Sequence, residues 1–482
     1  MRILFIQLES HLIERMGVMY LSTALNAQSH EVRLALAARA GYRRLHKIMQ
    51  DFEPRIVAFS TMTGEHLKLL EISRTLKRRH HFLAVFGGPH ATFHPRLIEE
   101  AGCDALCVGE GDLAFPEFCR RLEQGQEHWK TPNFVIEHEG ALFSNPPMPL
   151  ARDLDALGFP DRGLIYDADP DLEAETNKMF LASRGCPYQC SYCFNCEYNA
   201  IYSGKGPVMR HRSPEHLVDE IARVRSRHPL KLVWINDDIF LIKPKGWIER
   251  FCDLYQDRIA LPIICNVRAD LVSEEVVRRL HDAGLIGAGM GIECGDEDVA
   301  NTILSRNLTT SRIREAARTL KRNEIGIWAQ SLTGLPVENS YETDLKTLDL
   351  NIEIAPFFAW SSLLLPYPGT PIHDYAVRHG FLDASDPVDL ETNKRSSALT
   401  FGSPEEKRKV ENLHKLFGLI VRFPFLRRHS DLLCSLPLTP LYSALFYLCY
   451  GYYWRRAMHP SESLTERGTK YLRVFLRMVR KS

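Results

Sequence analysis

The N-terminal quarter of the chain alternates short, nearly continuous apolar runs with segments whose apolar residues recur at helical spacing. EHLKLLEISRTLKRRHH, residues 65–81, is one such helical segment. Apolar runs without polar alternation are typical of strands buried on both faces of a parallel sheet. We therefore predict a doubly wound α/β domain, whose ligands lie beyond the carboxyl ends of its strands. The predicted strands are residues 3–7, 32–36, 55–60, 82–88 and 104–111.

Two glycine-containing motifs fall at the ends of these predicted strands. GGPH occupies residues 87–90 and GEGD occupies residues 109–112. Glycines at such positions either form a tight turn without a ligand or let the backbone approach a bulky ligand closely. Both interpretations remain open for each motif taken alone.

After a stretch rich in proline and loop residues, 145–163, the alternation of strand and helix patterns resumes on a larger scale. Residues 214–227 and 273–284 have helical patterns between the strands. Six successive units predict a full or partial parallel barrel, whose chemistry lies on the loops that follow the strands. The predicted strands are residues 178–185, 231–237, 261–268, 287–293, 326–334 and 357–366.

These patterns divide the chain into four parts. We predict a Rossmann-like domain over residues 1–135, a linker over 136–169, a partial (β/α)6 barrel over 170–375 and a mostly helical region over 376–482. In the last part, residues 432–454 carry no charge and are followed by Arg455 and Arg456. A membrane span needs roughly 20 apolar residues, but this segment has two prolines and five tyrosines. A buried core or lid, a membrane-interface helix and a true span all remain open.

Charge and composition restrict the partners. Lysine plus arginine and aspartate plus glutamate number 60 each in the 482 residues, so no strong field favours nucleic acid. The apolar run before Glu9 is too short for a signal peptide. We therefore expect a cytoplasmic protein, with peripheral membrane contact through the C-terminal region as a further expectation.

Four of the twelve cysteines lie in LASRGCPYQCSYCFNCEYN, residues 181–199. Disulfide frameworks belong to short secreted chains, so this cluster indicates metal chemistry. Zinc requires a fourth protein ligand, which Cys196 offers. An iron–sulfur cluster with four irons, held by Cys186, Cys190 and Cys193 alone, leaves one iron open to a small ligand.

The spacing Cys-x3-Cys-x2-Cys after the first strand of a β/α barrel, with Tyr192 before the last cysteine, resembles the radical S-adenosylmethionine (SAM) superfamily. The resemblance covers about residues 170–375. It implies a 4Fe-4S cluster on Cys186, Cys190 and Cys193, with SAM bound to the open iron. Reductive cleavage of SAM would give a 5′-deoxyadenosyl radical that abstracts hydrogen from an unactivated carbon.

RIVAFSTMT, VFGGPHATFHP, CDALCVGEGD and LDALGFPDR look like the cobalamin-binding domain that precedes the barrel in one large radical SAM class. The resemblance implies that cobalamin inserts its nucleotide tail at the carboxyl ends of the strands. The residues expected to line the cobalamin site are Ser60, Thr61, Gly87, Gly88, Pro89, His90, Gly109 and Glu110.

The chain departs from the cobalamin-binding proteins that ligate cobalt through histidine. Their motif is D-x-H-x-x-G, whereas residues 9–14 read Glu-Ser-His-Leu-Ile-Glu. His11 stands at the right position, but the orienting aspartate and the glycine are missing. We therefore expect cobalamin to bind without His11 as its lower ligand.

The barrel loops supply the residues that the resemblance assigns to SAM and cobalamin. Glu293, in GMGIECG, is expected to hydrogen-bond SAM, with an ion pair as the alternative. Arg268, in NVRAD, is expected to bind the methionyl carboxylate, with a salt bridge to Asp270 or Asp237 as the alternative. The remaining residues expected at the cofactors are Tyr192, Asn236, Asp237, Gln330, Pro366 and Tyr367.

Three functions follow from the resemblance. The first is a cobalamin-dependent radical SAM methyltransferase that acts on an unactivated carbon of a natural product or lipid-like substrate. The second keeps both cofactors but performs an oxidative cyclisation or rearrangement without methyl transfer. The third, a non-catalytic cobalamin or metal sensor, has no use for an open iron. Either enzyme requires a reductase, flavodoxin or ferredoxin as electron donor.

Overall fold

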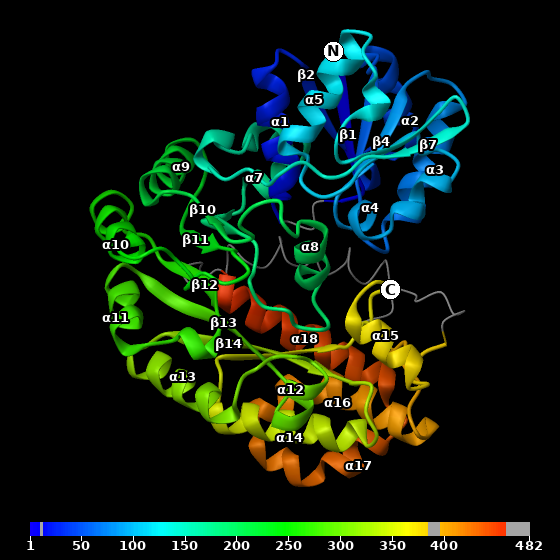
Figure 1. Ribbon diagram of the computed structural model, residues 1–482. Coiled ribbons are helices and arrows are strands. Elements are labelled where there is room, and N and C mark those ends of the chain that lie inside the picture. The colour runs from blue at the N-terminus through cyan, green and yellow to red at the C-terminus, as the bar shows by residue number, and fades with distance from the viewer. Residues whose placement is uncertain (10–12, 384–395, 459–482) are drawn as a thin grey trace.

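The computed structural model describes residues 1–9, 13–383 and 396–458. An N-terminal α/β domain, blue to cyan in Figure 1, lies above a green and yellow barrel domain. The orange C-terminal helices lie at the end of the molecule opposite the N-terminal domain, whereas the red C-terminal helix crosses the middle of the view. Both parts pack against the barrel. The predicted α/β class with a helical C-terminal region is therefore confirmed.

Five parallel strands form the centre of the first sheet, in the order β2-β1-β3-β4-β5. This doubly wound order places the switch in chain direction between β1 and β3, where ligands of such sheets bind. Apolar clusters fill both faces of the sheet, as the continuous apolar runs predict. The strands are β1 (Arg2–Gln7), β2 (Glu31–Leu36), β3 (Ile56–Ser60), β4 (Leu83–Gly87) and β5 (Ala105–Cys107).

A β-hairpin that the sequence analysis missed extends this sheet. Strands β6 (Phe134–His138) and β7 (Ala141–Ser144) pair antiparallel beyond β5. Their two-residue turn has positive φ at both Glu139 and Gly140, as type I′ turns require. The sheet thus continues nine residues past the predicted domain boundary at 135, and the predicted linker contains a strand.

The second sheet is the predicted partial barrel, with six parallel strands in the order β15-β14-β13-β12-β11-β8. Helices α10 (Trp247–Arg258), α11 (Glu274–Asp282) and α13 (Thr310–Arg322) cover its outer side (Figure 1). The strands are β8 (Asn177–Phe180), β11 (Leu232–Ile235), β12 (Ile263–Val267), β13 (Leu285–Glu293), β14 (Gly326–Thr333) and β15 (Phe358–Leu363).

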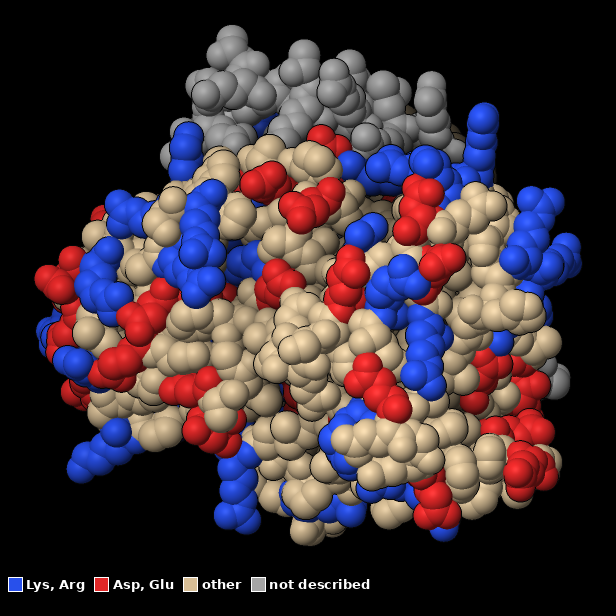
Figure 2. All heavy atoms as spheres, turned by 90° about the horizontal axis from the view of Figure 1, so that it is seen from above, with Lys and Arg blue, Asp and Glu red and all other residues tan. Residues whose placement is uncertain are grey.

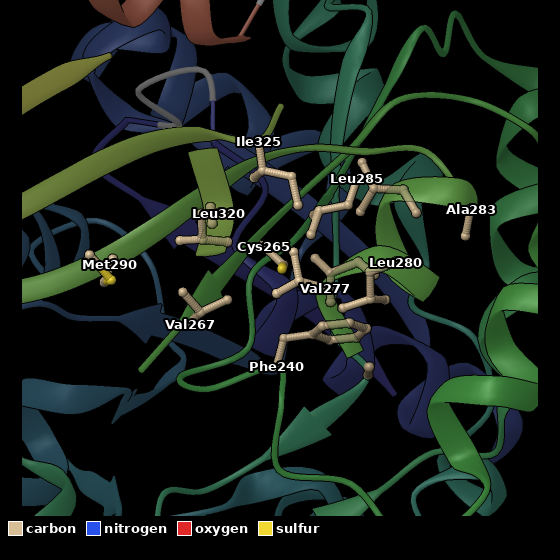
Figure 3. Close-up of a cluster of buried hydrophobic side chains, with 14 of the residues drawn as sticks. Phe240, Cys265, Val267, Val277, Leu280, Ala283, Leu285, Met290, Leu320 and Ile325 are labelled. Atoms are coloured by element: carbon tan, nitrogen blue, oxygen red, sulfur yellow. The ribbon is translucent and has the colours of Figure 1, made fainter. Parts of the chain in front are cut away.

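Alternation along the barrel strands separates an apolar outer face from a more polar inner face. Outward residues such as Cys265 and Val267 pack with Phe240, Val277 and Leu280 in the main core (Figure 3). On β13 the residues of the opposite parity are Gly287, Gly289 and Gly291. Because Gly289 has no side chain, the polar side chains of Asn266 and Gln330 on the two neighbouring strands approach β13 closely.

Helices α16 (Pro404–Arg422), α17 (Ser430–Ser435) and α18 (Thr439–Met458) form the C-terminal layer. Tyr442 and Phe446 of α18 are buried, so the uncharged segment packs partly as core. Within the described part of the chain, no helix is long and apolar enough to cross a membrane.

The charges are evenly mixed on the face seen in Figure 2, where basic and acidic side chains are interspersed over the N-terminal domain side. The view agrees with the equal numbers of basic and acidic residues in the sequence. This face therefore presents no extended field of one sign to a charged polymer.

Candidate active site

The cysteine loop follows β8 at the carboxyl end of the first barrel strand. Cys186 and Cys190 are buried and Cys193 is half-buried. Gly185, with φ of 90°, turns the chain into the loop, where a Cβ atom would lie 2.2 Å from the Val208 carbonyl oxygen. Cys196 lies on the short helix α8 (Asn195–Ile201), and its thiol donates to the Cys193 carbonyl at 2.9 Å.

The burial of the three cysteines is more consistent with ligands of an iron–sulfur cluster than with free thiols exposed to solvent. Burial raises the pKa of the Cys186 thiol to about 11 and that of Cys193 to about 12. Thiolates at such positions need a bound cation to hold them ionised. Among the described residues, no three His, Cys, Asp or Glu side chains converge on a single metal ion. A 4Fe-4S cluster does not require such convergence, because each cysteine binds a different iron.

Arg306, which the sequence analysis missed, lies against this loop. Its Nη1 atom is 4.0 Å from Cys190 Sγ and 3.1 Å from the Tyr192 hydroxyl, and its Nη2 donates to the Gly291 carbonyl at 2.6 Å. Its Nε is buried without a hydrogen-bond partner. Arg306 follows helix α12 (Glu297–Thr302) in the stretch SRNLTT, which has no pattern that marks a buried guanidinium.

Glu293 lies beside Arg306 at the end of β13. It has a left-handed backbone with φ of 60°, which is strained for a residue other than glycine. Burial raises the pKa of its carboxyl group, against the opposing charges of Arg306 and Arg268 and a hydrogen bond from Tyr192. Tyr192, Glu293 and Arg306 therefore form a buried charged group next to Cys190, where the amino and carboxylate groups of an amino acid would find partners.

We expect Arg306→Gln to keep the cluster but to lower SAM cleavage by roughly 10–100-fold, the usual effect of losing a residue that supports a metal site. The substitution removes the positive charge beside Cys190 without opening a large cavity. Iron content, 5′-deoxyadenosine formation and the KM for SAM measure the effect. Arg312→Gln, an exposed arginine paired with Glu315, is the control. Wild-type cleavage by Arg306→Gln would contradict this role.

A belt of amide side chains crosses the inner face of the barrel. Asn266 Nδ2 donates to Asn236 Oδ1 at 3.2 Å. A Cβ atom added to Gly289 would lie 2.6 Å from Asn266 Oδ1 and 3.4 Å from Gln330 Nε2. The sequence-predicted residues Asn236 and Gln330 are thus brought together across four neighbouring strands, with uncharged polar atoms directed inward.

Asp237 and Arg268 have protein partners. Asp237 accepts from the backbone N–H groups of Ala182 and Ser183 at 2.7 and 3.1 Å. It also pairs with Lys243 at 2.9 Å, and both side chains are almost fully buried. Arg268 Nε lies 2.9 Å from Asp270, and the guanidinium stacks 3.8 Å from the Tyr188 ring centre. The structure thus contains the salt-bridge alternative for Arg268, and it makes Asp237 a support of the cysteine loop.

The predicted cobalamin residues lie together at the carboxyl edge of the first sheet. The buried Thr61 hydroxyl donates to the Gly87 carbonyl at 2.7 Å. Gly88 has φ of 91°, and a Cβ atom there would lie 2.8 Å from the Thr61 carbonyl oxygen. The glycine at 88 is therefore required by contact with protein backbone, whereas a Cβ atom at Gly87 would meet only ordinary contacts.

Several buried polar atoms near the carboxyl edge of the first sheet have no hydrogen-bond partner in the protein. Such atoms are consistent with a site for a large polar ligand. Both amide atoms of Gln7, at the end of β1, are buried without a hydrogen bond. So are His66 Nδ1, at the start of α3 (His66–Lys77), and His94 Nε2 after α4 (Pro89–Phe93). Buried polar groups need partners, and cobalamin carries many amide groups. His94 lies in the stretch VFGGPHATFHP, but the sequence analysis assigned no role to it, and Gln7 and His66 belong to no motif that it recognised.

His90, which follows Pro89 at the start of α4, stacks on His66 with ring centres 3.7 Å apart. Its Nδ1 atom lies 3.2 Å from the Thr63 hydroxyl. Burial, with His66 and His94 nearby, lowers the pKa of His90 to about 3. The imidazole is therefore neutral at physiological pH. His11 lies outside the described residues, so the expectation that it does not ligate cobalt stays a prediction.

Gly109 and Glu110 join the two domains, which differs from the cofactor contact that the sequence analysis expected. Glu110 accepts from Arg210 at 2.6 Å and from the Tyr198 hydroxyl at 2.7 Å. A Cβ atom at Gly109 would lie 2.1 Å from the Tyr202 hydroxyl oxygen. These partners belong to the barrel, so the carboxylate neutralises a buried arginine across the interface.

Aromatic rings also connect the cysteine loop to the N-terminal domain. Phe194, directly after Cys193, stacks on Phe93 of α4 with ring centres 4.2 Å apart. Phe194 also contacts Tyr367, with ring centres 5.3 Å apart, in the loop after β15 that contains Pro366. Asp112 of α5 (Gly111–Glu123) binds Arg184 with two hydrogen bonds of 2.8 and 3.0 Å, two residues before Cys186. The cysteine loop is therefore held directly against the predicted cobalamin edge.

A second buried ion network fixes the domains. Glu220 of α9 (Pro214–Arg227) pairs with Arg162 of α6 (Arg162–Ala168) at 2.8 Å and with Arg212. Arg162 also reaches Glu14 of the N-terminal domain at 3.2 Å. All four side chains are buried. Removing one partner from such a network leaves uncompensated buried charge.

We expect Glu220→Gln to lower the free energy of unfolding by about 3–5 kcal/mol, because two buried arginines lose their carboxylate. Urea unfolding measures this, with the exposed Glu275→Gln as control. Burial alone would raise the pKa of Glu220, but Arg212 and Arg162 lower it. Its stabilisation is therefore complete above the unfolded pKa of about 4.3 and is lost as pH falls through the folded value. Equal unfolding midpoints for wild type and Glu220→Gln at neutral pH would refute this account.

The fold and the site define a two-domain enzyme, in which a three-cysteine loop on an open parallel barrel faces a doubly wound ligand-binding domain. Comparison with known families gives the same division. The B12 binding domain family matches residues 9–119, and the radical SAM superfamily matches residues 180–348. The chain is therefore a radical SAM enzyme with an N-terminal B12-binding domain, and its cofactors are a 4Fe-4S cluster, SAM and cobalamin.

Known proteins with similar sequences include methyltransferases and anaerobic cyclases. The uncharacterized methyltransferase PH0819 of Pyrococcus horikoshii is 25% identical over 76% of this chain and 79% of its own. The anaerobic magnesium-protoporphyrin IX monomethyl ester cyclase of Cereibacter sphaeroides is 26% identical over 70% of this chain. This chain covers only 56% of that cyclase.

Among solved structures, the cobalamin-dependent SAM radical enzyme OxsB, with aqua-cobalamin and SAM bound, has a similar fold. The TM-score is 0.70 at 15% sequence identity, and the match covers 99% of this chain and 75% of OxsB. This similarity extends over the N-terminal domain, the barrel and the C-terminal helices alike.

Proposed function

We propose that this protein is a cobalamin-dependent radical SAM methyltransferase that methylates an unactivated carbon of a small molecule. The observation that carries the proposal is the direct contact between the cysteine loop and the cobalamin edge, through the stack of Phe194 on Phe93. Holding two reactive groups at contact distance lowers a barrier by about 7–11 kcal/mol in favourable cases. Transfer of a methyl group to a substrate radical would be favoured in this way, because the methyl donor would lie beside the site of hydrogen abstraction.

When bound, the cluster supplies the electron that cleaves SAM, and cobalamin supplies a carrier for the methyl group. The chain's own residues hold these groups in place. Cys186, Cys190 and Cys193 would hold the cluster. Glu293 and Arg306 lie where the amino and carboxylate groups of SAM find opposite charges. Gly87 and Gly88, with Ser60, would form the edge that receives cobalamin.

An aromatic wall inside the barrel supports an apolar substrate such as a lipid-like molecule or a ring-bearing natural product. Trp328 of β14 and Trp234 of β11 contact Trp454 of α18, with ring centres 5.3 and 6.1 Å apart. Tyr450 packs on Trp360 at 4.7 Å. Trp328 Nε1 is buried without a hydrogen-bond partner, so it offers one donor within an apolar surface.

The second candidate is an oxidative cyclisation or rearrangement that uses both cofactors without methyl transfer. The sequence similarity to the Cereibacter sphaeroides cyclase supports this second candidate function. The same residues would hold the cofactors, and the difference would lie in the fate of the substrate radical. For either reaction we propose a small reductase, flavodoxin or ferredoxin as the electron donor.

Anaerobic incubation of the reconstituted enzyme with methyl-labelled SAM and an extract from a strain lacking the protein tests the proposed function. We expect one or more small molecules in the extract to gain the label as a carbon-bound methyl group. A Cys190→Ala enzyme in the same extract is the control. Substrate consumption and 5′-deoxyadenosine formation without transfer of the label would favour the cyclase alternative.

A further inference from the structure

Between Leu441 and Tyr452, one face of α18 is exposed to solvent and carries no charge. Leu441, Ala444, Leu448, Gly451 and Tyr452 recur at spacings of three, four or one residues, so they lie on one side of the helix, and all are exposed. The opposite side packs against the barrel layer. The solvent-facing side of a helix in a globular protein normally carries polar and charged residues. The apolar stripe departs from this pattern, and we therefore expect another molecule to cover it.

Neighbouring elements enlarge the apolar surface. Of the fifteen large hydrophobic side chains that are exposed among the described residues, seven fall within residues 423–452. This is far more than a segment of 30 residues would hold if such side chains were spread evenly. The seven are exposed by 40–64% and are Phe423, Phe425, Leu432, Leu438, Leu441, Leu448 and Tyr452. A concentration of exposed apolar side chains in one part of the chain is typical of an interaction site.

The charges of the same region are strongly one-sided. Between residues 418 and 458 the sequence has five arginines and a single acidic residue, Asp431, in a chain whose total charge is balanced. Arg455 and Arg456 follow the stripe directly. Arg422, at the end of α16, lies beside Tyr453 of α18. The apolar stripe therefore ends in a cluster of arginines, which favours a partner with an apolar layer and negative charge.

Three occupants are available, and charge separates them. A second copy of the chain would bring a second set of arginines to the contact. Residues 459–482 carry six lysines and arginines against two glutamates, so this segment repels the same surface. A bilayer that contains anionic phospholipid supplies acyl chains for the stripe and phosphates for the arginines.

We propose that the α17–α18 surface docks on an anionic phospholipid bilayer, with α18 lying in the plane of the interface. The stripe enters the boundary between headgroups and acyl chains, and the exposed Arg422 and Arg456 bind lipid phosphates. No helix of the described chain can span a membrane, so the contact is peripheral. The proposal does not depend on the reaction that the enzyme catalyses.

Flotation with vesicles tests this proposal on the full-length holoenzyme. Phosphatidylcholine vesicles with and without phosphatidylglycerol are compared at low and high salt. We expect binding to the anionic vesicles that weakens with salt. The triple variant Leu441→Ser, Leu448→Ser, Tyr452→Ser should lose roughly tenfold or more of that binding. The matched control is Leu67→Ser with Leu142→Ser, two equally exposed leucines of the N-terminal domain.

A second variant removes positive charge and leaves the apolar stripe intact. It also tests the proposal if the triple variant folds poorly. Arg422→Gln with Arg456→Gln, two exposed arginines, should weaken binding to anionic vesicles and leave the iron content unchanged. Wild-type protein that does not float with anionic vesicles would overturn the proposal. So would equal loss of binding in the Leu67 and Leu142 control, or a wild-type dimer in light scattering that the triple variant converts to monomer.

Discussion

Cys190→Ala is expected to reduce 5′-deoxyadenosine formation from SAM to background, and Cys186→Ala and Cys193→Ala should do the same. Each of the three thiolates binds one iron and leaves the fourth open for SAM, so the loss of one cysteine leaves a second iron without a protein ligand. Iron and sulfide content, the visible spectrum and 5′-deoxyadenosine formation under reducing, anaerobic conditions measure the loss.

Cys196→Ala is the matched control, because it removes a cysteine from the same loop. Its thiol hydrogen-bonds to the Cys193 carbonyl, and the residue lies on α8. We expect this variant to retain the cluster and SAM cleavage. Loss of iron in Cys196→Ala as complete as that in Cys190→Ala would contradict a cluster held by Cys186, Cys190 and Cys193 alone.

Gly88→Val is expected to abolish cobalamin binding while the cluster is retained. The added side chain would collide with the Thr61 backbone, and φ of 91° is strained for valine. Strain of about 1–3 kcal/mol would shift the loop after β4 away from the ligand edge. The cobalamin content after reconstitution, read from its absorbance, measures the effect alongside iron content.

Gly140→Val is the control for backbone strain alone. Gly140 also has positive φ, at 75°, but it lies in the β6–β7 turn with nothing within 4 Å of an added Cβ atom. This variant should bind cobalamin normally. Normal cobalamin content in Gly88→Val would mean that the loop after β4 does not form the ligand site.

The strands and the cysteine loop were predictable because each has a local signal. Apolar runs specify buried strands, and the spacing of Cys186, Cys190 and Cys193 specifies a metal site. The sequence analysis does not predict the β6–β7 hairpin, because it assigns residues 136–169 to a linker. The positive φ angles of Glu139 and Gly140 are those of a type I′ turn.

Residues whose role depends on long-range packing were not predictable from their neighbours in the sequence. Arg306 becomes part of the site only because its loop folds back to Cys190, more than a hundred residues earlier. Glu110 shows the reverse effect. Its motif suggested a ligand contact, but Arg210 and Tyr198 from the barrel occupy its carboxylate.

The uncharged C-terminal segment left three interpretations open because composition does not specify which face of a helix is buried. In the structure both faces of α18 are apolar, but only one packs. Phe446 and Trp454 contact aromatic residues of the barrel strands, whereas Leu448 is exposed. The segment is thus a core helix on one side and an open surface on the other.

Quantifying the SAM-derived products formed per turnover tests the central claim of methyl transfer most directly. With the labelled substrate identified from extracts, the holoenzyme should form 5′-deoxyadenosine and S-adenosylhomocysteine together, one of each for every methylated product. The two products report two uses of SAM, because one molecule is cleaved and another donates its methyl group. Formation of 5′-deoxyadenosine with product but without S-adenosylhomocysteine or a gain of one methyl group would contradict the account.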